Sequence, residues 1–261
     1  MRFEQFESEA EVAVAAADLL TATVHACAES RVILPAGRSP LRFYAEVVRR
    51  SRAGELDLAH VRFFQLDEYL DVAPSDARSF RSLLEQQLLS PLGRGPGQDE
   101  LLDGTAKDPR AEIERHAERL AQLGGADAAF LGIGRNGHVA FNEPNATLDY
   151  SARVVPLARE TRIAAEAEFG TGKAPLRGMT LGMREIVRAG RLVLLATGAA
   201  KSAIVAALFD EPPSSQRPAS LLLHHPDFTL LTDVAAASAL HTPLAAGAGR
   251  RRSAASGRGA G

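Results

Sequence analysis

Five short apolar segments recur along this chain, and longer stretches with helical periodicity separate them. The apolar segments span residues 31–35, 61–66, 127–133, 191–197 and 228–232. Each is too short and too apolar for a surface helix, so each predicts a strand buried on both faces. Strands that alternate with helices are typical of βαβ units. The sequence therefore predicts an α/β fold with a Rossmann-like open, mostly parallel sheet and helices on both of its faces.

The helical stretches and two weaker strand candidates complete the predicted fold. Helices are expected over residues 9–29, 79–89, 111–123 and 199–209, with another that begins near Leu41. The weaker strand candidates are residues 153–157 and 178–182. The length of 261 residues suits a single domain, which we assign to residues 1–244. Residues 245–261 (AAGAGRRRSAASGRGAG) contain too few apolar side chains to offset the entropy of ordering, so they predict a disordered tail.

Charge and cysteine content exclude several classes of protein. A net charge of -2 and a pI of about 6.4 argue against binding to nucleic acid or to an anionic membrane surface. Acidic residues at the N-terminus stand where a secretory signal needs basic ones. The single cysteine, Cys27, excludes an intrachain disulfide and is expected to lie buried on the first helix. We therefore expect a cytoplasmic protein with neither nucleic-acid nor membrane partners.

Two segments that follow predicted strands suit a phosphate group. In open parallel sheets, ligands bind beside the carboxyl ends of the strands. Ala36, Gly37, Arg38 and Ser39 form a glycine turn that leads into a helix, and such turns present free backbone N–H groups. Lys201 stands at a helix start, where a bound anion would relieve its unfavourable interaction with the helix dipole. A purely geometric turn and an exposed lysine are the alternatives.

Two other segments carry side chains that handle protons. Asp67 follows the strand at 61–66, where partial burial would suit a general base, although a helix cap or a solvated turn is the alternative. Asn136, His138 and Glu143 follow the strand at 127–133, and the carboxylate would orient the imidazole ring. One histidine with one glutamate supplies too few ligands for zinc, so no metal is expected. The four segments together predict proton transfer on a phosphorylated small molecule.

Four motifs in this order and spacing resemble one enzyme family: LPAGRSP, QLDEY, LGIGRNGHVAFNEP and ATGAAK. Over about residues 1–240 the chain resembles the glucosamine-6-phosphate deaminases, which share a sugar-phosphate superfamily with the 6-phosphogluconolactonases. The resemblance implies a cofactor-free hydrolase of amino-sugar metabolism. Its reaction would be aldose–ketose isomerisation with amine loss, giving fructose 6-phosphate and ammonia.

The resemblance also implies roles for the residues singled out above. Asp67 would move a proton between C1 and C2 of the opened sugar. His138 would assist ring opening, supported by Glu143 and Asn136. The segment Ala36 to Ser39 and Lys201 would hold the phosphate of a phosphorylated amino sugar.

The chain departs from the family pattern at several positions. Many members have an aspartate where this chain has Asn136, so Glu143 must carry more of the charge stabilisation. Ala167 stands where an arginine often contacts the phosphate, and Arg38 stands where a small residue is common. We hypothesise that Arg38 replaces the missing arginine. In the effector site of some hexameric members, a lysine is typical where this chain has Val155, although Thr147 and Arg153 match. We therefore predict no strong activation by N-acetylglucosamine 6-phosphate.

Several functions stay open on the sequence alone. The leading interpretation is a glucosamine-6-phosphate deaminase. The alternatives are a 6-phosphogluconolactonase-type hydrolase or a deaminase of another amino-sugar phosphate. A non-catalytic sugar-phosphate sensor fits less well, because Asp67, His138 and Glu143 are all present. The sugar epimer, the oligomeric state and the physiological direction are open, and a homo-oligomer is compatible with the sequence.

Overall fold

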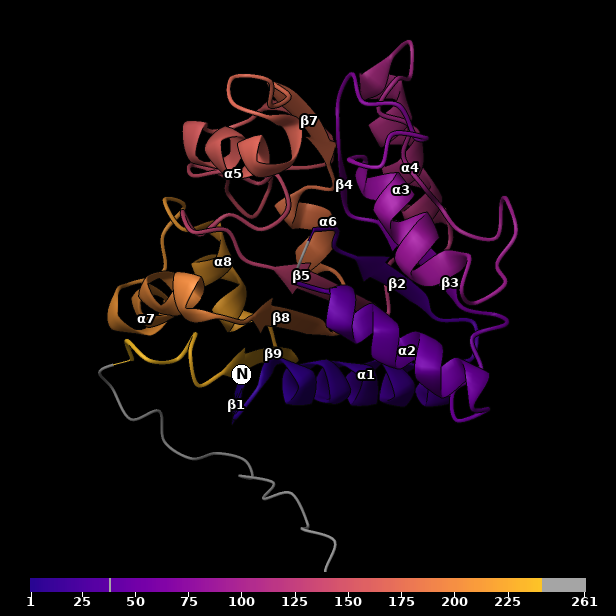
Figure 1. The fold of residues 1–261 in the computed structure, drawn as a ribbon, viewed down its shortest axis with the longest axis horizontal. Helices are drawn as coiled ribbons and strands as arrows, with labels where there is room; N and C mark the ends of the chain where they lie inside the picture. Colours follow the sequence, from indigo (N-terminus) through magenta and orange to yellow (C-terminus); the bar gives the residue numbers. More distant parts are fainter. Residues whose placement is uncertain (38, 241–261) are drawn as a thin grey trace, which may run out of the picture.

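A six-stranded parallel sheet occupies the centre of the computed structural model, with strand order β1-β9-β8-β5-β2-β3 (Figure 1). A second sheet has three antiparallel strands in the order β4-β7-β6. The structure describes residues 1–37 and 39–240. Arg38 and the predicted tail at 245–261 therefore lie outside the described residues.

The bounds of the elements are as follows. The strands are β1 (Arg2–Phe6), β2 (Arg31–Leu34), β3 (Arg62–Gln65), β4 (Asp67–Tyr69), β5 (Ala128–Gly132), β6 (Arg153–Pro156), β7 (Arg177–Thr180), β8 (Leu192–Ala196) and β9 (Phe228–Asp233). The α-helices are α1 (Glu9–Ala26), α2 (Leu41–Arg52), α3 (Phe80–Leu84), α4 (Pro109–Gln122), α5 (Arg159–Phe169), α6 (Met183–Val187), α7 (Ser202–Asp210) and α8 (Pro218–Leu221). A π-helical turn η1 (Glu85–Leu89) continues α3, and the 3-10 turns are η2 (Ala199–Lys201) and η3 (Leu222–His224).

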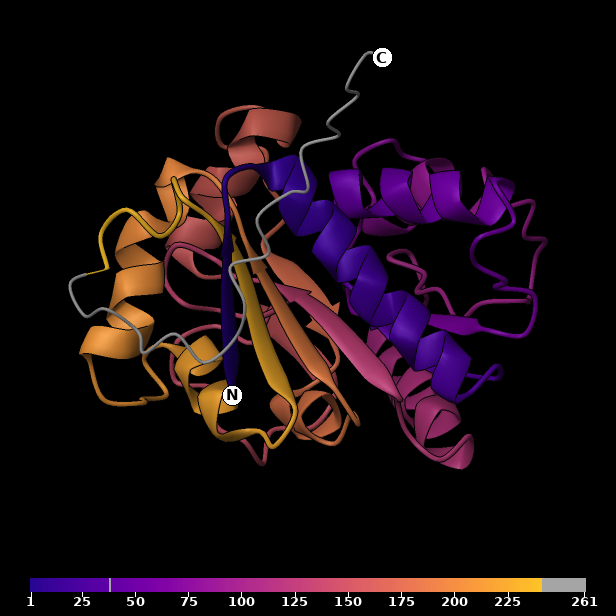
Figure 2. The same ribbon diagram turned by 90° about the horizontal axis from the view of Figure 1, so that it is seen from below.

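Helices cover both faces of the parallel sheet, as predicted. Successive residues of β5 point into different layers: Ala128 and Phe130 pack with α1 and α2, whereas Ala129 and Leu131 pack with α4, α6 and α7. Figure 2 shows α1 and α2 on one side of the strands and α7 on the other. Burial on both faces explains why these strands are continuously apolar, and each large side chain contributes about 2 kcal/mol.

The structure confirms the two weaker strands, adds strands β1 and β4, and corrects the position of Cys27. The weaker candidates at 153–157 and 178–182 are strands β6 and β7, but they belong to the small antiparallel sheet. β1 is a half-exposed edge strand that lacks the apolar run used for prediction. The DEY turn is itself a short strand, β4. Cys27 is exposed, because α1 ends at Ala26 and the cysteine follows as its C-cap.

Within residues 1–37 and 39–240, no helix is long and apolar enough to cross a membrane.

Candidate active site

The four segments singled out from the sequence meet at one edge of the parallel sheet. They follow β2, β3, β5 and β8, which occupy adjacent positions in the order β8-β5-β2-β3. Because these strands are parallel, their carboxyl ends lie side by side. The topology thus brings four groups to the same edge: Ala36, Gly37 and Ser39, then Asp67, the 134–143 turn and Lys201.

The turn after β5 holds an imidazole against a carboxylate. His138 Nδ1 lies 3.0 Å from Glu143 Oε2, and the two side chains are 20% and 12% exposed. Asn136 donates from Nδ2 to the same Glu143 oxygen at 3.0 Å. The Asn136 amide oxygen also accepts the backbone N–H of His138 at 3.2 Å. Asn136 therefore orients both partners of the His138–Glu143 pair.

The first turn of α5 completes the environment of Glu143. The backbone N–H of Ala158 donates to Glu143 Oε1 at 3.2 Å, and the Thr161 hydroxyl lies 3.1 Å from His138 Nδ1. Burial raises the pKa of Glu143, but hydrogen bonds with His138, Thr161 and Asn136 outweigh it, so the pKa lies below its ordinary value. The Glu143 carboxylate is therefore held ionised beside the ring. Since Asn136 carries no charge where many family members have an aspartate, Glu143 is the negative charge that contacts the imidazole.

Two glycines allow the turn to close over the histidine ring. A Cβ at Gly134 would lie 2.4 Å from His138 Nε2, which is far inside van der Waals contact. Gly137 adopts a φ of 84°, and its N–H donates to the Gly134 carbonyl at 3.0 Å. An L side chain rarely adopts this backbone conformation. The glycines therefore have a geometric role in placing His138.

The two acids of β4 have different surroundings. Glu68 is fully buried, and its carboxylate accepts the Ser79 hydroxyl at 2.9 Å and the N–H groups of Phe80 and Arg81 at 3.0 and 2.8 Å. It therefore caps α3. Asp67 is 5% exposed, and its side chain forms no hydrogen bond or ion pair with the described residues. Burial, together with the nearby charges of Glu68 and Glu143, raises the pKa of Asp67 well above its ordinary value.

A buried hydrogen-bond network centred on Gln65 holds strand β4 in position. Gln65 donates to the carbonyl of Asp67 at 2.8 Å and to Glu68 Oε2 at 3.1 Å. His116 of α4 lies with Nε2 2.8 Å from the Gln65 carbonyl oxygen, and burial lowers the pKa of His116 to about 4. The imidazole is therefore neutral at pH 7 and donates one hydrogen bond.

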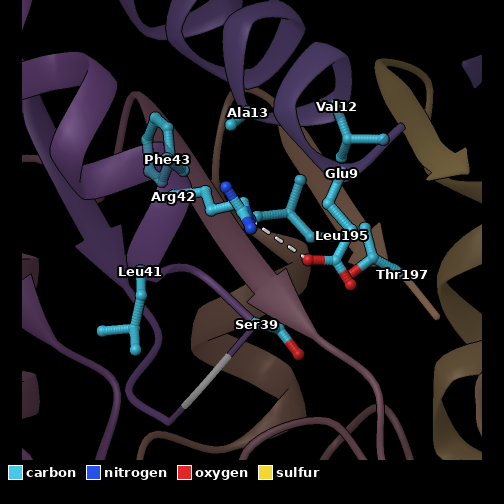
Figure 3. A pocket seen from close by; sticks show the side chains of 9 residues that line it. All are labelled: Glu9, Val12, Ala13, Ser39, Leu41, Arg42, Phe43, Leu195 and Thr197. Atoms are coloured by element: carbon cyan, nitrogen blue, oxygen red, sulfur yellow. Dashed lines mark hydrogen bonds and ion pairs between the residues drawn. The ribbon is translucent and has the colours of Figure 1, made fainter. Parts of the chain in front are cut away.

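The predicted phosphate loop lies beside a cavity at the N-terminal ends of α1 and α2. Gly37 has a φ of 99°, and Ala36, Gly37 and Ser39 are partly exposed. The cavity has a volume of about 440 Å³. Ser39 lines it, as does Thr197, which follows β8. Figure 3 shows Glu9 of α1 paired across this cavity with Arg42 of α2, at 3.2 Å. Arg38 itself is outside the described residues, so its predicted contact with phosphate stays a prediction.

Lys201, at the end of η2, contacts the segment that leads into the turn that carries His138. Its ammonium donates to the Ile133 carbonyl at 2.7 Å. Burial and the charge of Arg135 lower the pKa of Lys201. A partly buried cation at this edge favours an anionic ligand, and the contact of Lys201 with phosphate stays a prediction.

The departures from the family pattern have clear positions in the structure. Ala167 is an exposed residue of α5. Val155 is buried in a small apolar cluster with Tyr69 and Phe141. Arg153 stacks on Tyr150 and donates to Asn142 Oδ1 at 3.1 Å. Thr147 donates to Asp149. The last two side chains are therefore already engaged within the chain.

Thr161 and the backbone of Ala158 are the site residues that the sequence did not predict. Thr161 lies in α5, six residues before Ala167, and a backbone donor such as the Ala158 N–H leaves no sequence signal. No group of three or more His, Cys, Asp or Glu side chains suited to a metal ion occurs in the part of the chain that the structure describes.

Proton-handling side chains beside a candidate phosphate loop, at the carboxyl edge of a parallel sheet, define a class of α/β sugar-phosphate enzymes. The family model of glucosamine-6-phosphate isomerases and 6-phosphogluconolactonases matches residues 7–231. The chain belongs to this family.

Individual relatives agree with this assignment. The chain is 36% identical over 209 residues to a glucosamine-6-phosphate deaminase of Hahella chejuensis, with 79% of each chain covered. It is 39% identical over 207 residues to that of Streptomyces avermitilis, covering 78% of this chain and 79% of the relative. A solved monomeric glucosamine-6-phosphate deaminase matches with a TM-score of 0.88 at 29% identity, over 92% of this chain and all of that one. A 6-phosphogluconolactonase from Trypanosoma cruzi shares the fold, with a TM-score of 0.75 at 20% identity over 92% of this chain and 97% of that one.

Proposed function

We propose that the protein is a glucosamine-6-phosphate deaminase, which converts glucosamine 6-phosphate and water to fructose 6-phosphate and ammonia. The observation that carries the proposal is the His138–Glu143 pair at 3.0 Å, at the same sheet edge as the buried carboxyl of Asp67. One imidazole and one separate carboxylate suit a reaction with two distinct proton transfers. The curated relatives that carry this activity match most of the chain.

Ring opening is the step that we assign to His138. The Glu143 carboxylate accepts the Nδ1 proton, which leaves Nε2 as the nitrogen that exchanges protons with the substrate. Nε2 takes the proton of the C1 hydroxyl and returns a proton to the ring oxygen as the C1–O5 bond breaks. Glu143 stabilises the transient imidazolium, and Asn136 and Thr161 keep the ring in place.

Proton transfer between neighbouring carbons is the step that we assign to Asp67. Its carboxylate takes the proton from C2 of the open aldehyde and delivers it to C1, while the carbonyl oxygen gains a proton and the amino group loses one. The aldehyde thereby becomes an alcohol and C2 becomes an imine. Water then adds to C2 and ammonia leaves, which gives the ketose; this net use of water is the sense in which we expect a hydrolase. A raised pKa makes Asp67 a stronger base than an exposed aspartate.

We assign binding of the substrate phosphate to Ala36, Gly37, Arg38, Ser39 and Lys201. Support comes from the positive φ of Gly37 in the glycine turn and from the partly buried Lys201 ammonium beyond the adjoining strand end. Arg38→Ala and Lys201→Gln should each raise KM for the phosphorylated substrate about tenfold or more, since each removes a charged contact. Lys107→Gln, at an exposed position, is the matched control. An unchanged KM in Arg38→Ala would contradict its assignment.

Ammonia release is the direct test of the proposal. Purified protein is incubated with glucosamine 6-phosphate, galactosamine 6-phosphate or unphosphorylated glucosamine, and 6-phosphogluconolactone is followed in parallel. We expect release from glucosamine 6-phosphate alone. Lactone hydrolysis without ammonia would favour the lactonase branch. Release from the galactose epimer would indicate that the change at Ala167 has shifted the substrate.

Regulation and location complete the proposal. We expect hyperbolic kinetics, because Val155 is buried where the effector site has a lysine; a sigmoidal curve relieved by N-acetylglucosamine 6-phosphate would contradict this. The protein should act in the cytoplasm, for which a single cysteine without an intrachain partner is the support.

A further inference from the structure

A second cavity lies against α5, and neither Lys201 nor a described residue of the predicted phosphate loop lines it. Its volume is about 490 Å³, and it is lined by Arg159, Arg162, Ile163, Glu166, Gly172, Ala174 and Leu176. Two apolar side chains of this wall, Ile163 and Leu176, are 50% and 65% exposed. The volume is typical of a site for a small ligand.

The two arginines of this cavity lack the partners that other arginines in the chain have. On α2, Arg49 and Arg50 both pair with Glu46 at 2.8 Å. Arg159 and Arg162 form no ion pair with a described residue, and the Nε of Arg162 is buried without a hydrogen-bond partner. A guanidinium without an ion pair keeps an uncompensated charge, so an anion in the cavity that both arginines line would compensate it.

The acidic residue that lines the cavity, Glu166, restricts which ligands the cavity can bind. Glu166 lines the same cavity, and its Oε1 accepts the N–H of Gly172 at 2.9 Å. A carboxylate disfavours a ligand that is anionic throughout and favours hydroxyl donors beside it. We propose that this cavity binds the phosphate monoester of a small polyol, with the phosphate on Arg159 and Arg162 and the hydroxyl groups toward Glu166.

Helix α5 connects the proposed site to the turn that carries His138 and Glu143. The N–H of Ala158 and the hydroxyl of Thr161, which hold Glu143 and His138, belong to the same helical turn as Arg159 and Arg162. A ligand that holds the arginines therefore stabilises the turn of α5 that orients the imidazole.

Hydrogen exchange on the full chain tests the proposal, with glycerol 3-phosphate as the probe and glycerol as the uncharged control. At a probe concentration of ten times Kd, backbone exchange in α5 and residues 170–176 should slow about tenfold. Arg159→Gln/Arg162→Gln should abolish this protection. Arg159→Gln alone, an exposed change with little effect on folding, should weaken binding about threefold. Arg110→Gln, on the exposed surface of α4, should leave it intact.

Three outcomes would overturn the proposal. They are the absence of slowing in the unmodified protein, slowing that persists in the double variant, and protection that follows protein concentration instead of probe concentration. The last outcome would identify a second copy of the chain as the occupant. The readout requires no turnover, so it stays interpretable even if the chain releases no ammonia from glucosamine 6-phosphate.

Discussion

Asp67 and Glu68 are neighbours in sequence, yet their carboxyl groups have opposite surroundings. Glu68 is surrounded by hydrogen-bond donors at the start of α3, whereas Asp67 has none among the described residues. In a strand, consecutive side chains point to opposite sides, and this accounts for the division. Both of the interpretations that the sequence left open, a helix cap and a base, therefore have a residue in the structure that fits them.

Replacing the proposed base should remove the reaction and leave the fold intact. Asp67→Asn keeps the volume of the side chain but cannot accept a proton from carbon, so we expect deamination to fall about 10²–10⁴-fold. Ammonia release measures the loss, and circular dichroism checks the fold. Deamination at near the original rate would exclude Asp67 as the base.

A methyl group at Gly134 should displace the histidine ring. The added Cβ of Gly134→Ala would lie 2.4 Å from His138 Nε2, so the ring must move, and we expect kcat to fall about tenfold or more. Gly132→Ala is the matched control, because a Cβ there would contact nothing within 4 Å. Equal kcat values in the two variants would show that the ring does not need its present position.

At the scale of elements, α3 depends on a side chain from another element. Its N-cap, Ser79, and the N–H groups of the next two residues all donate to Glu68 of β4. Burial raises the pKa of Glu68, although the N–H groups of Arg81 and Phe80 oppose this shift. The helix start and the strand that carries Asp67 are thus fixed to each other.

Removing this cap should destabilise the protein. Glu68→Ala leaves several buried donors without an acceptor, and we expect a loss of about 3–5 kcal/mol in the free energy of unfolding by urea. Glu85→Ala serves for comparison, since Glu85 forms a partly exposed pair with Arg81 and should contribute about 0.5 kcal/mol or less. Similar losses in both variants would argue against the capping role.

The sequence predicted the parallel sheet better than the small antiparallel one, for a physical reason. Strands β2, β5 and β8 are buried on both faces, so their apolar runs are unmistakable. β4 contains two acids, and β6 carries Arg153 and Pro156, so neither shows such a run. The site residues at strand ends were predictable because topology aligns those ends. The contacts from α5 were not, because they depend on how the small sheet packs.

At the scale of the whole molecule, one buried histidine couples stability to pH. The pKa of His116 lies at about 4 in the folded chain against an ordinary value of 6.5, chiefly because of burial. Between pH 4 and pH 6.5, His116 is protonated in the unfolded chain but neutral in the folded chain. Stability should therefore decrease as the pH falls from about 6.5 to about 4, by about 3 kcal/mol in total.

A variant without this proton uptake tests the coupling. His116→Gln retains a donor for the Gln65 carbonyl but does not titrate, so its unfolding free energy should vary less with pH over this range. His60→Gln, at an exposed site, should follow the original protein. An unchanged pH dependence in His116→Gln would assign the acid sensitivity to other groups.

The small antiparallel sheet also bears on how such a protein changes over evolution. Asp67 is held by pairing with Thr180 of β7, and α5 is inserted between β6 and β7. Substitutions on the exposed face of this insertion leave the strand register, and therefore the position of Asp67, untouched. A lineage can lose an arginine such as the one absent at Ala167, and explore other phosphorylated sugars, without having to rebuild the residues that move the proton.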